Sequence, residues 1–235
     1  MDFSAQLNYI WSVRGPLLEG LGISLAIAVF ALIIGFVIGV ILAMIKIMPQ
    51  TNVVTKILNK FADVYIAVIR GTPLLVQLLI MYNVVLVSFK YTGTNLPVPI
   101  IAFGINSGAY MAEIIRSGIN SIDKGQLEAG RSLGLTWRKA MFKIVIPQAI
   151  KVVVPTIFNE IIILVKETSV VCYIAVRIGG KQVWDLLGVA ENLGLNKAGA
   201  YMSLIFTVAI MYLIIVLILT FVQKIIERRL SKNER

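Results

Sequence analysis

The sequence predicts an all-α integral membrane protein with about five transmembrane helices. Apolar side chains make up 58% of the 235 residues and charged side chains only 14%, and the mean hydropathy is +0.89. Soluble domains carry about 25% charged residues. Several apolar runs are also long enough to cross a hydrocarbon layer of about 30 Å as a helix, at about 1.5 Å per residue. A lipid bilayer is therefore the solvent that suits this composition.

The expected spans follow one another along a single membrane domain over residues 1–235. Leu21 to Ile45 contains no charged residue and forms the first span. The second apolar run is too long for one straight helix and is interrupted between Arg70 and Pro73. We expect a break there, near the middle of the membrane, because proline removes a helical N–H donor. The five expected spans cover residues 20–45, 54–89, 98–118, 144–177 and 199–225.

The basic residues predict the orientation, because short cytoplasmic loops carry an excess of Lys and Arg. Residues 116–151 and the C-terminal tail are both rich in basic side chains. We therefore expect a cytoplasmic loop at 119–143 and a cytoplasmic C-terminus, which puts the N-terminus outside, together with the turn at Lys90 and the loop at 179–197. The basic residues behind this prediction are Arg116, Lys124, Arg131, Arg138, Lys139, Lys143, Lys151, Lys224, Arg228, Arg229, Lys232 and Arg235.

Two Gly-x-x-x-Gly patterns lie inside expected spans, Gly35 with Gly39 and Gly104 with Gly108. Glycines at this spacing form a helix face that lets another helix approach closely. One such match is expected by chance in so apolar a chain, so each pattern predicts either a helix contact or nothing.

The cytoplasmic loop has the pattern of two short helices joined by a turn. Asp123 can cap the first helix, and Gln126 three residues later would complete a capping box. Gly134 suits the left-handed position that ends a helix, and Thr136 can cap the second helix. From these residues alone, an ordinary helical hairpin on the membrane surface is an equally good interpretation.

A longer motif in this loop resembles the EAA loop of ABC importer permeases. Glu128-Ala129-Gly130 is followed by Gly134 and, after nine more residues, by Ile144 and Pro147. Gly130 replaces the usual third alanine and Ile146 the usual leucine before proline, and both are mild departures. In that family the hairpin docks in a groove of the ATPase subunit and transmits its closure to the spans. The resemblance therefore implies that Glu128, Ala129, Gly130 and Gly134 couple this chain to an ATPase.

Two further segments, Arg70 to Gln77 and Asn106 to Gly118, look like the polar amino acid branch of these permeases, which includes histidine, arginine and glutamine systems. The resemblance covers Leu17 to Arg229. It implies a permease in the bacterial cytoplasmic (inner) membrane, surrounded by lipids. It also implies a homo- or heterodimer with a second permease subunit, two ATPase subunits and an external solute-binding protein.

Residues 125–132 resemble the phosphate-binding pattern G-x-x-x-x-G-K-[ST], but we reject this match. Arg131 stands where lysine should be, Glu128 would direct a carboxylate at phosphates, and no buried strand precedes the loop. The expected chain is therefore not an enzyme and carries no cofactor, since ATP and Mg would bind the partner subunit. With no His and only Cys172, we expect no metal site. Nucleic acid is not an expected partner, because no basic run is interleaved with aromatic residues.

Arg70 and Glu160 are candidate substrate-binding residues, because charged side chains inside spans are costly and usually face a cavity or a partner. Each lies near a proline that disturbs its helix. We expect Arg70 or the nearby Thr72 to hold the substrate's carboxylate, and Glu160 with Asn159 to meet a cationic group. The Asn-Glu pair resembles subgroups that carry basic amino acids, which favours arginine, lysine or histidine.

Other interpretations stay open from the sequence alone. Arg70 and Glu160 could neutralise each other, or pair with Asp63 or Lys166, and Glu113 with Arg116 has the spacing of a local ion pair. Lys166 and Glu167 could line the path or stabilise a dimer seam. An ion-coupled secondary amino acid carrier is the alternative function, but such carriers usually have more spans and internal repeats. A membrane enzyme or channel is a second alternative, and the lack of His, of clustered acids and of a nucleophile constellation argues against catalysis.

Overall fold

The computed structural model describes residues 3–88 and 93–232. Ten α-helices occur in this part of the chain, with short π-helical segments at Met81–Val85 and Met141–Val145 and 3-10 turns at Thr168–Tyr173 and Ala198–Ala200. The helices are α1 (Phe3–Ser12), α2 (Arg14–Ile47), α3 (Val53–Arg70), α4 (Leu74–Ile80), α5 (Pro97–Asn120), α6 (Lys124–Ser132), α7 (Trp137–Ala140), α8 (Ile146–Glu167), α9 (Leu186–Asn196) and α10 (Tyr201–Lys232).

The helical fold confirms the predicted class. Four continuous helical segments are long and apolar enough to cross a membrane, and the pair α3 and α4 makes up to five if it counts as one broken span. The four segments are Arg14–Ile47, Pro97–Asn120, Trp137–Tyr173 and Tyr201–Leu230. The membrane boundaries and the orientation stay predictions, and residues 89–92, with the expected turn at Lys90, lie outside the described residues.

The segment after α8 departs from the sequence prediction. We expected one helical span over 144–177, but the continuous helical segment ends at Tyr173, and residues 176–178 form a strand. The strands β1 (Val176–Ile178) and β2 (Lys181–Val183) pair antiparallel, so the chain is not purely α-helical. Gly179 and Gly180 make the turn with φ of +57° and +79°, a conformation that glycine adopts without strain. The expected external loop after the hairpin contains α9.

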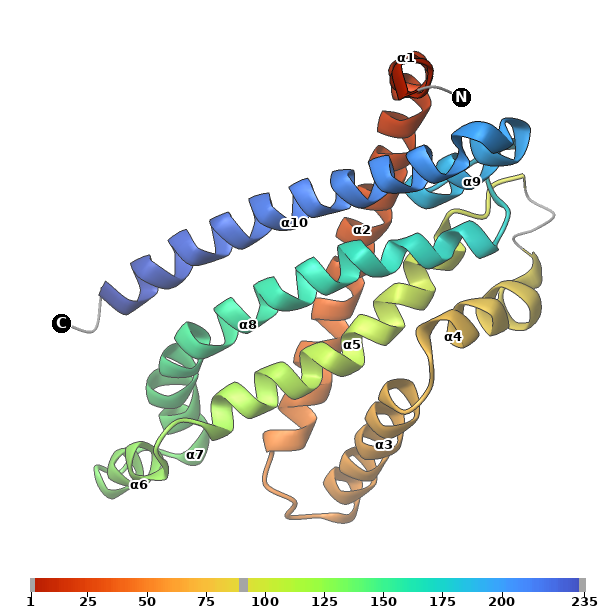
Figure 1. Ribbon diagram of the computed structural model, residues 1–235. Coiled ribbons are helices and arrows are strands. Elements are labelled where there is room, and N and C mark those ends of the chain that lie inside the picture. The colour runs from red at the N-terminus through yellow and green to blue at the C-terminus, as the bar shows by residue number, and fades with distance from the viewer. Residues whose placement is uncertain (1–2, 89–92, 233–235) are drawn as a thin grey trace.

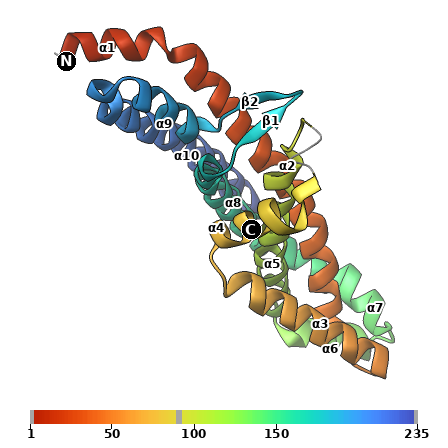
Figure 2. The same ribbon diagram turned by 90° about the vertical axis from the view of Figure 1, so that its right-hand side faces the viewer.

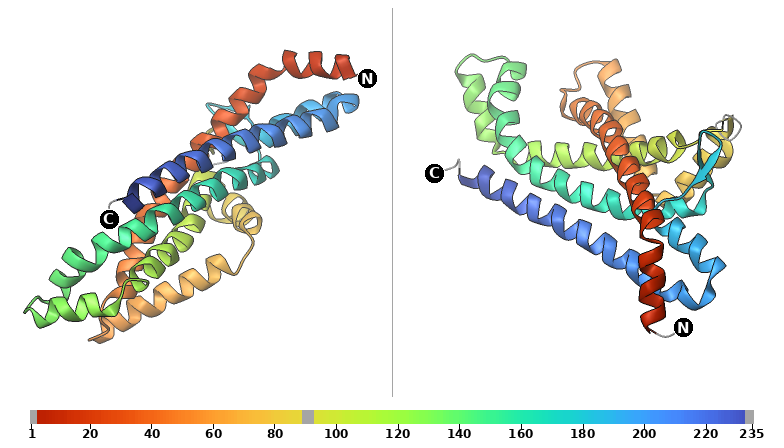
Figure 3. Two further views of the ribbon diagram at one scale, coloured as in Figure 1. Left: turned by 60° about the vertical axis from the view of Figure 1, so that its left-hand side comes forward. Right: turned by 90° about the horizontal axis from the view of Figure 1, so that it is seen from above.

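The helices place two groups of short elements at opposite ends of the molecule. Figures 1 and 2 show α6 and α7 at one end, and α1, α9 and the β-hairpin at the other. The two views of Figure 3 show the same separation, with α2, α5, α8 and α10 running between the ends. The predicted cytoplasmic hairpin and the predicted external segments are therefore far apart.

The core is organised around the contact between α2 and α5. Both Gly-x-x-x-Gly patterns lie in this contact, so each marks a helix interface. A Cβ added at Gly35 would lie 2.8 Å from Ser107, and one added at Gly104 would lie 2.7 Å from Ile34. These distances are too short for real Cβ atoms, so only glycine allows the two backbones to approach this closely.

Candidate functional site

The broken span positions the first group of polar residues. The side chain of Asn52 caps α3 by accepting a hydrogen bond from Thr55 N at 2.9 Å. At its other end, α3 stops at Arg70, and α4 begins at Leu74 after Pro73, which has no N–H to continue the helix. The two helical parts are bent by 104° at this point, which confirms the predicted break.

The side chain of Gln77 occupies this bend. Its Nε2 donates to Ile69 O at 2.7 Å and lies 3.1 Å from Thr72 O and 2.8 Å from Thr72 Oγ1. Its Oε1 accepts a hydrogen bond from Asn106 Nδ2 of α5 at 2.9 Å. The sequence motif from Arg70 to Gln77 contains this residue but does not indicate its role; the available signal was an uncharged hydrogen-bonding residue in an apolar run.

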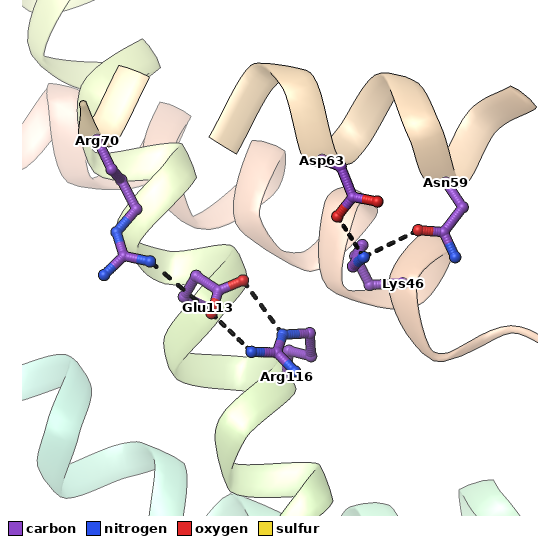
Figure 4. A network of polar contacts seen from close by, with 6 residues as sticks. All are labelled: Lys46, Asn59, Asp63, Arg70, Glu113 and Arg116. Carbon is purple, nitrogen blue, oxygen red and sulfur yellow. Dashed lines mark hydrogen bonds and ion pairs between the residues drawn. The ribbon is translucent and has the colours of Figure 1, made fainter. Parts of the chain in front are cut away.

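Arg70 pairs with α5 instead of with Glu160. Its Nη1 lies 3.8 Å from Glu113 Oε2, and its guanidinium lies over the ring of Tyr110, 5.2 Å from the centroid. Glu113 also accepts two hydrogen bonds from Arg116, at 3.1 and 2.8 Å, which is the local ion pair that the spacing predicted. Figure 4 shows Glu113 between the two arginines. With two arginines and one carboxylate, the cluster of Arg70, Glu113 and Arg116 has a net charge of +1.

A second polar cluster attaches α3 to α2. Lys46 of α2 donates to Asn59 Oδ1 at 2.9 Å and forms an ion pair with Asp63 (Figure 4). Asp63 is thus engaged with Lys46, and the suggested pairing of Asp63 with Arg70 is not found in the part of the chain that the structure describes. These contacts leave the guanidinium of Arg70, whose side chain is 43% exposed, with one long ion pair.

Glu160 is buried between α8 and α5, with 5% of its surface exposed. Ser107 Oγ donates a hydrogen bond to its Oε1 at 3.2 Å. Within residues 3–88 and 93–232, neither Arg70 nor Lys166 forms an ion pair with it. A buried carboxylate with one neutral partner is an unfavourable arrangement that a cation or a proton would relieve.

Asn159 and Thr72 lie differently from Glu160. Asn159 is exposed on the face of α8 that also carries Thr156 and Lys166. A cavity of about 360 Å³ is lined by Arg70, Glu113 and Arg116 from one side and by Thr156 from the other. Glu160 follows Thr156 by about one helical turn along α8 but is buried and is not among the residues that line this cavity. Thr72 is exposed too, but its hydroxyl donates to Val68 O at 2.8 Å.

The predicted helical hairpin is present as α6 and α7. Asp123 Oδ1 accepts from Gly125 N at 2.8 Å, and Thr136 Oγ1 accepts from Lys139 N at 3.4 Å, so both caps exist. The box with Gln126 is not formed as predicted, because Gln126 Oε1 accepts from Gln148 instead, at 3.3 Å. The turn residue Gly134 has a φ of +83°, as predicted.

The hairpin presents part of its motif to the surface and buries the rest. Glu128 and Ala129 are exposed, while Gly130 is buried against α7 and against the π-helical segment Met141–Val145 that follows it. A Cβ at Gly130 would lie 2.7 Å from Ile144 Cδ1, which accounts for glycine in place of the usual alanine. Sequence reasoning missed Leu133, whose side chain is 84% exposed beside the turn. The hairpin therefore offers small and apolar atoms to a docking partner.

The phosphate-binding pattern at 125–132 is part of helix α6. Most of its N–H groups donate within that helix, so the segment does not form a phosphate cradle. Among the described residues, no group of three His, Cys, Asp or Glu side chains is placed to hold a metal ion.

Residues 35–232 match the family described as "Binding-protein-dependent transport system inner membrane component". The chain belongs to this family. The predicted importer permease, its multi-pass place in the inner membrane and its lack of enzymatic activity are thereby confirmed. The predicted partners, an ATPase subunit, a second permease subunit and an external solute-binding protein, are those with which such permeases work.

Known proteins similar to the permease share most of its length. The arginine transport system permease protein ArtQ of Bacillus subtilis is 36% identical over 100% of this chain and 99% of its own. The L-cystine transport system permease protein TcyB of the same organism is 39% identical over 72% of this chain and 69% of its own. A crystal structure of an amino acid ABC transporter with histidines has a TM-score of 0.81 and 35% identity, covering 97% of this chain and 99% of the other.

Proposed function

We propose that the permease carries a basic amino acid across the cytoplasmic membrane. Transport is driven by hydrolysis of ATP, which binds with Mg to the partner ATPase subunits. A relative that covers the whole chain is an arginine permease, and a similar solved amino acid ABC transporter is described with histidines. The cystine permease shows that relatives of comparable identity differ in substrate. The choice of a basic substrate therefore depends on the charges of this chain's own site.

Glu160 is the observation that carries the proposal. Its carboxylate is buried and has one hydrogen bond, from the neutral Ser107. A cationic side chain of the substrate would supply the missing positive charge, and in a low-dielectric site the pairing is far stronger than in water. The exposed amide of Asn159, the next residue, can add hydrogen bonds from the open face of α8.

Arg70 is placed to hold the other end of an amino acid. Its guanidinium borders the cavity beside Thr156 and is only loosely held by Glu113. A planar guanidinium binds a carboxylate through two parallel hydrogen bonds. Thr72 is the weaker of the two candidates for this role, because its hydroxyl proton is already directed to Val68 O.

The hairpin of α6 and α7 couples this site to the ATPase. Exposed Glu128, Ala129 and Leu133 form the docking surface, and Gly134 sets the angle between the short helices. The path from the hairpin to the site is direct, because α7 continues through Met141–Val145 into α8, which carries Glu160. A displacement of the hairpin is thus transmitted along one continuous helical segment.

The test is arginine uptake into proteoliposomes that contain the permease, its ATPase and its solute-binding protein. We expect Glu160→Gln to lower the maximal rate of arginine uptake at least about tenfold, because a charge-assisted contact in the membrane site is replaced by a neutral one, whereas the solute-binding protein sets the apparent KM. Glu19→Gln, at an exposed position of α2, is the matched control and should behave like the wild type. An unchanged maximal rate in Glu160→Gln, with normal melting of the complex, would exclude the proposed site.

The alternative of an ion-coupled carrier predicts uptake by the permease alone. Membership of a binding-protein-dependent family does not favour it. In the same proteoliposomes, uptake that continues without ATP and without the ATPase, driven by a sodium or proton gradient, would establish the carrier instead.

A further inference from the structure

The bend between α3 and α4 leaves backbone groups that need partners. The last carbonyls of a helix have no N–H from the following turn, and Pro73 removes one more donor. Gln77 Nε2 supplies the missing N–H groups, to Ile69 O at 2.7 Å and to Thr72 O at 3.1 Å. The hydroxyl of Thr72 satisfies Val68 O in turn. One side chain therefore closes the end of α3 at the residues beside Arg70.

The same side chain ties this end of α3 to α5. Gln77 Oε1 accepts from Asn106 Nδ2 at 2.9 Å, and Asn106 is 3% exposed, so this contact is shielded from solvent. The next residue, Ser107, donates to Glu160. Hydrogen bonds and one peptide link thus run from the neighbour of Arg70 to Glu160, by way of Gln77 and α5.

Among the described residues, the guanidinium of Arg70 has no comparable anchor of its own. Its ion pair to Glu113 is 3.8 Å long, beyond hydrogen-bond distance, and the Tyr110 ring is 5.2 Å away. The direction of the side chain consequently depends on where the backbone at the end of α3 is held. A binding group stays in a productive geometry only when surrounding hydrogen bonds fix it.

We propose that Gln77 is a positioning residue that, through its bonds to Ile69, Thr72 and Asn106, holds Arg70 in place to bind the carboxylate of the substrate. This inference rests on the proposed binding of a carboxylate by Arg70 and extends it to a residue that touches no substrate. Gln77 and Arg70 together set the requirement for a free carboxylate, whereas Glu160 sets the requirement for a positive charge.

The test compares L-arginine with argininamide, in which an amide replaces the carboxylate. Equilibrium binding of each is measured on the permease–ATPase complex in detergent, without the solute-binding protein, so that only the membrane site selects. We expect the wild type to bind arginine at least about tenfold more tightly than argininamide, as one charge-assisted pair provides. Arg70→Met should bring the ratio close to one.

Gln77→Met keeps the length of the side chain and removes its hydrogen bonds. We expect it to reduce the ratio at least about threefold while argininamide binding stays within about twofold of the wild type. Gln77→Glu keeps an acceptor for Asn106 but has no N–H for the carbonyls at the end of α3. The preference for arginine over argininamide should therefore fall in this variant as well. Gln182→Met, at an exposed glutamine of β2, is the control and should keep the wild-type ratio.

Two outcomes would overturn the inference. If Gln77 only supports the fold, its substitution would weaken the binding of arginine and of argininamide equally. If Gln77 has no role, the ratio of the two affinities would stay unchanged in both variants. If Gln77→Met fails to assemble, Gln77→Glu decides. A failure of the proposed function looks different: the wild-type complex would bind neither compound, or Arg70→Met would leave the ratio intact, which removes the carboxylate role and the inference with it.

Discussion

Replacing Gly35 by alanine tests the close approach of α2 and α5. The added Cβ would lie 2.8 Å from Ser107 Cβ and Oγ and 3.2 Å from Gly108 N, whereas ordinary contacts begin at about 3.4 Å. The helices must then separate by about 0.6 Å, or Ser107 must move away from Glu160. Overpacking of this kind destabilises a protein by about 1–3 kcal/mol.

The measurement is the apparent melting temperature of the purified complex, together with arginine uptake. For a chain of this size, about 1 kcal/mol corresponds to about 2–4 °C, so we expect Gly35→Ala to melt about 2–12 °C lower. Uptake should fall as well, because Ser107 is the hydrogen-bond partner of Glu160. Gly22→Ala, in the same helix with no atom within 4 Å of the new Cβ, is the control and should melt at or slightly above the wild-type temperature. Equal melting of the two variants would refute the role assigned to the glycine interface.

Four further changes probe other parts of the molecule. Gly134→Ala places an L-residue at φ +83°, which costs about 1–2 kcal/mol, so solute-stimulated ATP hydrolysis should fall several-fold while basal hydrolysis persists; unchanged stimulation would show that the turn geometry is not needed. Leu133→Ser, at a side chain 84% exposed, should leave the fold intact but reduce the ATPase recovered in a pull-down, and full recovery would argue against docking at this residue. Burial raises the pKa of Asp185 to about 7, so its folded form holds a proton that the unfolded form has released between about pH 4 and 7; the melting temperature should drop as the pH rises through this window and level off above it, and Asp185→Asn should flatten that slope. Lys46→Met removes an ion pair to Asp63 and also the hydrogen bond to the buried Asn59, so a loss of about 1–3 kcal/mol is expected, and an unchanged melting temperature would contradict it.

The identity of the candidate site residues was readable from the sequence, but their partners were not. A charge such as Arg70 or Glu160 in an apolar run stands out at once, because a bilayer tolerates it only for a reason. Which group neutralises it depends on helix rotation and on contacts between residues far apart in the chain. Arg70 meets Glu113, 43 positions later, and Glu160 meets Ser107, 53 positions earlier. Neither pairing has a local sequence signal.

The hairpin of α6 and α7 shows the opposite case. Its caps at Asp123 and Thr136 and its left-handed glycine at 134 are decided by interactions within a few residues, and the structure contains all three. The box with Gln126 failed for a tertiary reason, since Gln148 of α8 provides a competing hydrogen bond. The β-hairpin at 176–183 was missed because its register is set partly from outside, by Asn95 Oδ1 accepting from Arg177 N.

The sequence by itself determined three properties: that the chain is a membrane protein, at which residues its second span breaks, and at which residue the hairpin of α6 and α7 turns. These properties follow from local composition, from proline and glycine, and from charges that a bilayer excludes. Only the tertiary structure decided that Glu160 of α8 is buried against α5, that Arg70 is left loosely held, and that Gln77 closes the bend beside it. Those contacts join distant segments, and the packing of whole helices, governed by glycines such as Gly35, brings them within hydrogen-bond distance.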